Sequence, residues 1–161
     1  APLKAARLDY MVQKAVEMGA ASLIPVLTQR TQVSRLKDER LAANAIEAAE
    51  QCGVLSLPAI EAEVKLAPFL AHLSPQTLLI FCDEDTEIAD PVAALVMHRG
   101  AEDVVVLIGP EGGFTAEERE MILRHARICR LSLGPRILRA DTAAVAALAL
   151  VQAALGDWPR S

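Results

Sequence analysis

The most informative segment of this sequence is Leu107-Ile108-Gly109-Pro110-Glu111-Gly112-Gly113-Phe114-Thr115. It joins an apolar run to the start of a helix through a loop with three glycines and one proline. Glycine lets backbone amides come close to a ligand, and a helix start offers unpaired N–H groups. The spacing is neither GxGxxG nor that of a loop ending in GK[ST], which argues against a dinucleotide site and a P-loop. Taken alone, the loop is also compatible with a plain strand-to-helix turn.

Apolar strands and helices alternate on both sides of this loop. Residues 77–82 and 104–108 are continuous apolar runs, and 128–133 follow a helix that the capping box Thr115-Ala116-Glu117-Glu118 begins. Continuous hydrophobicity is typical of parallel strands covered on both faces. The alternation predicts one domain over residues 1–161, of the α/β class, with a parallel sheet and helices on both faces.

Shorter elements precede these strands. Apolar residues at helical spacing over 8–16 predict a helix that ends at Gly19. The run 22–27 predicts a short strand, which Pro25 limits to a sheet edge or a bulge. Three more elements are expected before residue 77: a helix that Asp38 begins, a strand over 58–61 and a helix over 66–73.

The last helix is expected over Ala143–Leu155, with Asp141 or Thr142 as its cap. It is apolar on nearly every side, so it must be buried, either within this chain or against a partner subunit. The uncharged run 142–156 is too short to span a bilayer. We therefore expect no membrane association.

A second loop runs from Leu131 to Thr142, where Gly134-Pro135 is a turn signal. Open α/β sheets bind ligands at the carboxyl ends of their strands. Both loops leave such ends, which favours a shared pocket. The arginines in the second loop, Arg136 and Arg139, either serve this pocket or form a plain ion pair with Asp141.

The composition excludes several classes of function. The net charge of −5 gives no global attraction to nucleic acid, although arginines crowd residues 119–139 and basic residues gather over 30–40. The three cysteines, without CxxC spacing, are expected to be buried thiols in a reducing cytoplasm. The three histidines are scattered, so we expect no metal site.

The two loops together resemble the signature of the RsmE family. These enzymes are methyltransferases of the SPOUT superfamily, which methylate N3 of a uridine in small-subunit (16S) ribosomal RNA. Further matching segments, in the family's order, are Lys14–Gly19, Gln29–Thr31, Glu47–Cys52 and Leu57-Pro58. The family usually has Glu where Asp141 stands.

The resemblance implies a C-terminal deep trefoil knot, which periodicity alone could never suggest because knots are so rare. It also implies a homodimer, S-adenosylmethionine as cofactor, the ribosomal RNA or the assembled small subunit as partner, and an N-terminal PUA-like RNA-binding domain that precedes this SPOUT domain. The residues expected to hold the cofactor are Ile108, Gly109, Pro110, Glu111, Gly112, Gly113, Leu131, Ser132, Leu133, Gly134, Ile137 and Leu138.

For catalysis, the resemblance assigns charge stabilisation first to Arg139 and second to Arg30, from the same or the partner subunit. Arginine does not serve readily as a base, because its pKa is above about 12. Glu111 or Asp141 is the candidate proton acceptor, although either carboxylate could instead orient an arginine. Two alternatives stay open: methylation of another RNA position such as a ribose 2'-hydroxyl, and a non-catalytic module that binds an adenine ligand or RNA.

Overall fold

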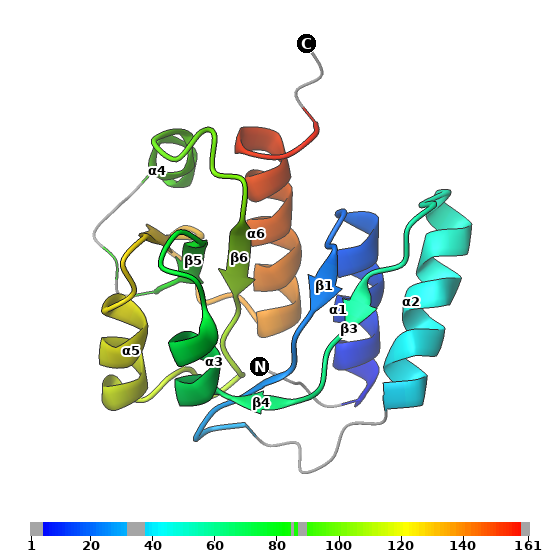
Figure 1. Ribbon diagram of the computed structural model, residues 1–161, viewed down its shortest axis with the longest axis horizontal. Coiled ribbons are helices and arrows are strands. Elements are labelled where there is room, and N and C mark those ends of the chain that lie inside the picture. Colours follow the sequence, from blue (N-terminus) through cyan, green and yellow to red (C-terminus); the bar gives the residue numbers. More distant parts are fainter. Residues whose placement is uncertain (1–4, 32–37, 85, 87–89, 159–161) are drawn as a thin grey trace.

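Three parallel strands form the central sheet (Figure 1). The computed structural model describes residues 5–31, 38–84, 86 and 90–158. The strands are β5 (Leu78–Cys82), β6 (Val104–Leu107) and β7 (Ile128–Leu131), in the order β6-β5-β7. In the register, Ile80 of β5 lies opposite Val106 on one side and Cys129 on the other. The predicted parallel sheet is confirmed.

Helices cover both faces of this sheet. The chain passes from β5 to β6 through α4 (Pro91–Val96) and from β6 to β7 through α5 (Ala116–Leu123). The two crossovers run in opposite directions along the sheet, and because crossovers are right-handed, their helices lie on opposite faces. On the α5 face the core also includes α3 (Leu66–His72), and on the α4 face it includes α6 (Ala140–Ala154).

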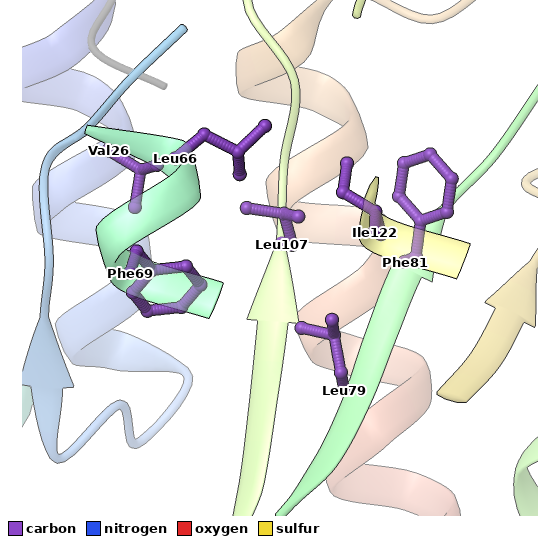
Figure 2. Packing of buried hydrophobic residues seen from close by; sticks show 7 residues of the cluster. All are labelled: Val26, Leu66, Phe69, Leu79, Phe81, Leu107 and Ile122. Atoms are coloured by element: carbon purple, nitrogen blue, oxygen red, sulfur yellow. The ribbon is translucent and has the colours of Figure 1, made fainter. Parts of the chain in front are cut away.

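The middle strand β5 divides the core into two clusters. Leu79 and Phe81 point to the side where Ile122 of α5 and Leu107 of β6 lie (Figure 2). Leu78 and Ile80 join the cluster on the opposite face, which Leu95, Cys129, Leu131 and Ala147 complete. The continuous apolar run of β5 is therefore explained by burial on both faces, as expected.

Short parallel pairs in the N-terminal half correct the strand predicted over 22–27. Pro25 lies between β1 (Ser22–Leu23), which pairs with β3 (Ala59–Ile60), and β2 (Val26–Leu27), which pairs with β4 (Val64–Lys65). Proline has no N–H to donate, but its carbonyl accepts a hydrogen bond from the Val64 N–H at 3.0 Å. Residues 22–27 therefore form two short strands, each of which pairs with a different partner strand.

Two N-terminal helices pack beside these pairs. Helix α1 (Ala5–Glu17) packs against α2 (Asp38–Cys52) and against α6. Gly19 lies in the turn that directly follows α1 and has a φ of +77°. It therefore ends the helix, as predicted. Gln152 of α6 donates a hydrogen bond to the Met18 carbonyl at 2.6 Å, which ties the end of α1 to the C-terminal half.

The start of the last helix differs from the prediction. Helix α6 begins at Ala140 with Arg139 as its N-cap residue, and no side chain caps it. Asp141 and Thr142 therefore lie inside the first turn, where the Asp141 charge favours the helix dipole. The buried face of α6 is a stripe of alanines: Ala140, Ala144, Ala147 and Ala154. One face of the helix is thus buried within this chain, and most of its other residues are half-buried.

Among the residues that the structure describes, no helix is long and apolar enough to cross a bilayer. No group of three or more His, Cys, Asp and Glu side chains in the same residues is arranged to hold a metal ion.

We expect Ile122→Ala to lower the free energy of unfolding by about 2–5 kcal/mol, because the fully buried side chain of α5 would leave a cavity against the sheet. Urea denaturation followed by circular dichroism measures the change. Met97→Ala is the control, since Met97 is 83% exposed and its loss should cost under about 0.5 kcal/mol. Equal costs for the two variants would contradict the packing described.

Candidate functional site

The carboxyl ends of β5, β6 and β7 open into a cleft of about 500 Å³. The glycine-rich loop lines one part of it and the loop after β7 another, so the shared pocket expected from the sequence is present. All but two of the predicted site residues line the cleft, and Ser132 and Arg30 are the exceptions. Those that line it are Ile108, Gly109, Pro110, Glu111, Gly112, Gly113, Leu131, Leu133, Gly134, Ile137, Leu138 and Arg139.

The glycine-rich loop is shaped by close contacts that a side chain would block. Gly113 has a φ of +67°, and its N–H donates to the Pro110 carbonyl at 2.9 Å. A Cβ on Gly109 would lie 2.9 Å from the Phe114 ring, which packs edge-on against Phe81 with centroids 5.5 Å apart. Glycine is thus required at 109 by the aromatic pair beneath the loop.

Arg30 reaches the glycine-rich loop from the N-terminal half of the same chain. Its guanidinium Nη1 donates to the Gly112 carbonyl oxygen at 2.7 Å. Its aliphatic stem lies 3.3 Å from the place of a Gly112 Cβ, so the backbone and the side chain are in direct contact. The turn from Thr28 to Thr31 holds Arg30 there through a backbone hydrogen bond of 3.1 Å.

Glu111 lies beside an arginine that the sequence analysis did not select. The Arg7 Nη1 atom of α1 is 3.6 Å from Glu111 Oε1, and the Glu111 side chain is 24% exposed. Arg7 also lines the cleft. Of the two roles left open for Glu111, this contact fits the orientation of an arginine, and the place of Glu111 in the cleft fits proton transfer. The sequence gives no signal for Arg7, because α1 reaches the cleft only in the folded chain.

The loop after β7 presents Arg136 and Arg139 to the cleft. Both side chains are exposed, and among the described residues neither has an ion pair with Asp141. Asp141 instead accepts a hydrogen bond from the Thr142 N–H at 3.0 Å. The ion-pair alternative from the sequence is therefore wrong. Ile137, expected as an apolar wall, is 89% exposed at the cleft margin.

Asp83 organises the floor of the cleft and was missed from the sequence. Asp83 is only 4% exposed. Its carboxylate accepts hydrogen bonds from Arg119 of α5 at 2.9 and 3.2 Å and from Arg130 of β7 at 2.7 Å. Asp83 directly follows β5, and this position at a strand end was the available signal. Arg119 and Arg130, two of the arginines clustered over residues 119–139, therefore connect elements of the fold. The cluster as a whole is not a solvent-exposed surface.

Cys82 also lines the cleft, but as a neutral thiol. Burial, with a smaller effect of Cys129, raises the pKa of Cys82 to about 12. Thiolates, not thiols, are nucleophiles. Cys82 is therefore a small apolar wall residue at physiological pH.

The fold and the cleft define an α/β protein with a cleft between two loops at the carboxyl edge of a parallel sheet. Residues 1–152 match the family described as RNA methyltransferase domain, and the chain belongs to this family.

The chain is similar to the ribosomal RNA small subunit methyltransferases E of Rickettsia conorii and of a Synechocystis strain. It is 31% identical to the first over 150 residues, which are 93% of this chain and 61% of the relative. It is 32% identical to the second over 157 residues, which are 94% of this chain and 51% of that relative. The resemblance to the RsmE family is confirmed, and the chain spans less than two thirds of the length of these relatives.

Two solved structures have the same fold. A ribosomal RNA small subunit methyltransferase E from Neisseria gonorrhoeae, bound to S-adenosylmethionine, superposes with a TM-score of 0.84 at 27% sequence identity. The superposition covers 98% of this chain and 65% of that chain. A protein from Legionella pneumophila, in complex with the same cofactor, gives 0.81 at 34% identity, over 96% of this chain and 64% of its own.

We expect Gly109→Ala to destabilise the protein by about 1–3 kcal/mol, because the new methyl group overlaps the Phe114 ring. Thermal or urea unfolding measures this cost. Phe114→Leu removes the ring edge, so Gly109→Ala should cost less in that background. Equal costs in both backgrounds would show that the ring is not the obstacle.

The raised pKa of Cys82 predicts a loss of stability in alkaline solution. Above its ordinary value of 9.0 the thiol ionises in the unfolded chain but stays protonated in the folded one. The free energy of unfolding therefore falls as pH rises from 9 toward 12, by up to about 1.4 kcal/mol per pH unit from this group. Urea denaturation at pH 8.5 and 10 should show a smaller fall for Cys82→Ala than for the unaltered protein. Parallel falls would contradict the shift.

Proposed function

We propose that this chain is the catalytic domain of an S-adenosylmethionine-dependent methyltransferase that methylates N3 of a uridine in small-subunit ribosomal RNA. The observation that carries the proposal is the meeting of the two signature loops in one cleft at the carboxyl edge of the sheet. Relatives over 93 and 94% of this chain are named ribosomal RNA small subunit methyltransferase E. Because bacterial ribosomes assemble in the cytoplasm, the proposal places this protein there.

The cleft suits an adenosine-containing cofactor. Its volume of about 500 Å³ lies in the range of small-molecule sites, which is roughly 300–1,000 Å³. Leu131, Leu133 and Leu138 offer apolar walls for a base, and the exposed backbone at Gly134 offers polar groups. Gly109 and Gly112 keep the other wall free of side chains. When bound, S-adenosylmethionine supplies an electrophilic methyl group.

The residues of this chain then have to prepare the uridine. An imide N–H is a poor nucleophile until it loses its proton, and the negative charge that develops must be stabilised. Arg139 at the cleft is the first candidate for this stabilisation, and Arg30 beside Gly112 is the second. Glu111 lines the cleft and Asp141 does not, which favours Glu111 as the proton acceptor.

The proposal includes the finer features of the family. The segment from β5 to α6 would form the deep trefoil knot of the SPOUT superfamily, with the two signature loops inside it. A homodimer is supported by α6, where Val145 and Leu148 stay partly exposed on an apolar helix. An N-terminal PUA-like domain in the complete protein would share the contact with RNA.

Calorimetric titration with S-adenosylmethionine tests the cofactor. We expect saturable binding to a dimer whose mass is measured in parallel, and loss of binding in Gly112→Val, because the valine side chain would collide with the Arg30 stem. Met97→Ala is the control for a change outside the cleft, because the Met97 side chain is 83% exposed. No binding by a well-folded dimer would contradict the cofactor assignment.

Methyl transfer by the full chain to small ribosomal subunits that lack the modification tests the reaction. Mass spectrometry of the nucleosides should give 3-methyluridine, whereas a ribose 2'-O-methyl product would establish the alternative specificity. We expect Arg139→Ala to lower kcat by about 10²–10³-fold while the cofactor still binds, the range for loss of one charge-stabilising donor. Unchanged turnover in Arg139→Ala would remove Arg139 from this role.

A further inference from the structure

Glu118 joins two segments that lie far apart in the sequence. Its side chain is almost fully buried, with the residue 2% exposed. One carboxylate oxygen, Oε1, accepts a hydrogen bond from the Gln29 backbone N–H at 2.7 Å. The other, Oε2, accepts one from the Thr115 backbone N–H at 3.0 Å. The second bond belongs to the capping box of α5, but a capping box does not require the first.

These bonds complete a closed ring of contacts beside the glycine-rich loop. Gln29 precedes Arg30, whose guanidinium donates to the Gly112 carbonyl at 2.7 Å. Gly112 leads within three residues to Thr115, and Thr115 returns to Glu118. The glycine-rich loop and the Arg30 turn are therefore held together at both ends, by Arg30 at one and by Glu118 at the other.

We propose that Glu118 is a positioning residue, which fixes Arg30 against the glycine-rich loop and so couples the place of this arginine to the shape of the cofactor cleft. The inference rests on the proposed function. A buried carboxylate that accepts backbone N–H bonds makes stronger hydrogen bonds than a neutral group. Because the Arg30 stem touches Gly112 directly, a shift of the turn also shifts a loop that lines the cleft.

Glu118→Gln in the full chain breaks this ring with little change in volume. The amide keeps one carbonyl oxygen, so its NH₂ group must face the N–H of either Gln29 or Thr115, and one bond is lost. We expect kcat for methyl transfer to fall by about tenfold or more, since misplacement by 1 Å can cost about a hundredfold. We also expect S-adenosylmethionine to bind several-fold more weakly.

Thr115→Ala is the matched control. It removes the hydroxyl that accepts from the Glu118 N–H at 3.3 Å, so it weakens the same helix start but leaves both carboxylate bonds in place. We expect a lower Tm with kcat within about twofold of the unaltered protein, as for a lost cap. An equal fall of kcat in Thr115→Ala and Glu118→Gln would overturn the inference.

Arg30→Ala provides the second test, through a double-mutant cycle. If Glu118 acts through Arg30, Glu118→Gln in the Arg30→Ala background should lower kcat and cofactor affinity no further than Thr115→Ala does there. Full additivity, measured by turnover and by calorimetry, would overturn the inference and leave the proposed function intact. No cofactor binding by the unaltered protein would instead overturn the proposed function, and this inference with it.

Discussion

Burial of β5 on both faces is the constraint on which the rest of the structure depends. Helices cover both faces of this strand, so its buried backbone groups need partners along both edges, and β6 and β7 supply them by running parallel to it on either side. Parallel strands bring their carboxyl ends to one edge of the sheet. The loops after β6 and β7, separated by a helix in the sequence, therefore face each other across the end of β5, and the cleft follows from this arrangement.

Elements with strong local signals were predictable. The apolar runs gave β5 and β6, and Thr115 with Glu118 gave the start of α5, because a cap depends only on residues three apart. The two errors in the secondary structure arose where local signals compete. Pro25 divides a strand because each half has its own distant partner. Helix α6 starts before Asp141 because tertiary packing buries Ala140, which overrides the capping preference of the side chains that follow.

The candidate site was predictable as far as it is built from contiguous loops. Both signature loops carry their chemistry within a dozen residues, so the pattern of residues was visible before their placement. Arg7 and the Asp83 cluster were not predictable, because each acts through a contact between segments at least 36 residues apart. Asp83 had a weak positional signal at the end of β5, whereas nothing in α1 distinguishes Arg7 from a surface arginine.

The charge pattern near the cleft is compatible with the proposed action of an acidic chain on RNA. The net charge of −5 is an average over the whole chain, but salt screens exposed charges beyond about 8–10 Å, so the RNA that we propose as substrate would respond to the groups near the cleft. Arg7, Arg119, Arg136 and Arg139 line the cleft, and Arg30 borders it at Gly112. Of these, Arg119 pairs with Asp83 and Arg7 lies near Glu111, so the charges of both arginines are engaged with carboxylates of this chain. Arg136 and Arg139, exposed at the cleft, are then the side chains best placed to meet an anionic substrate.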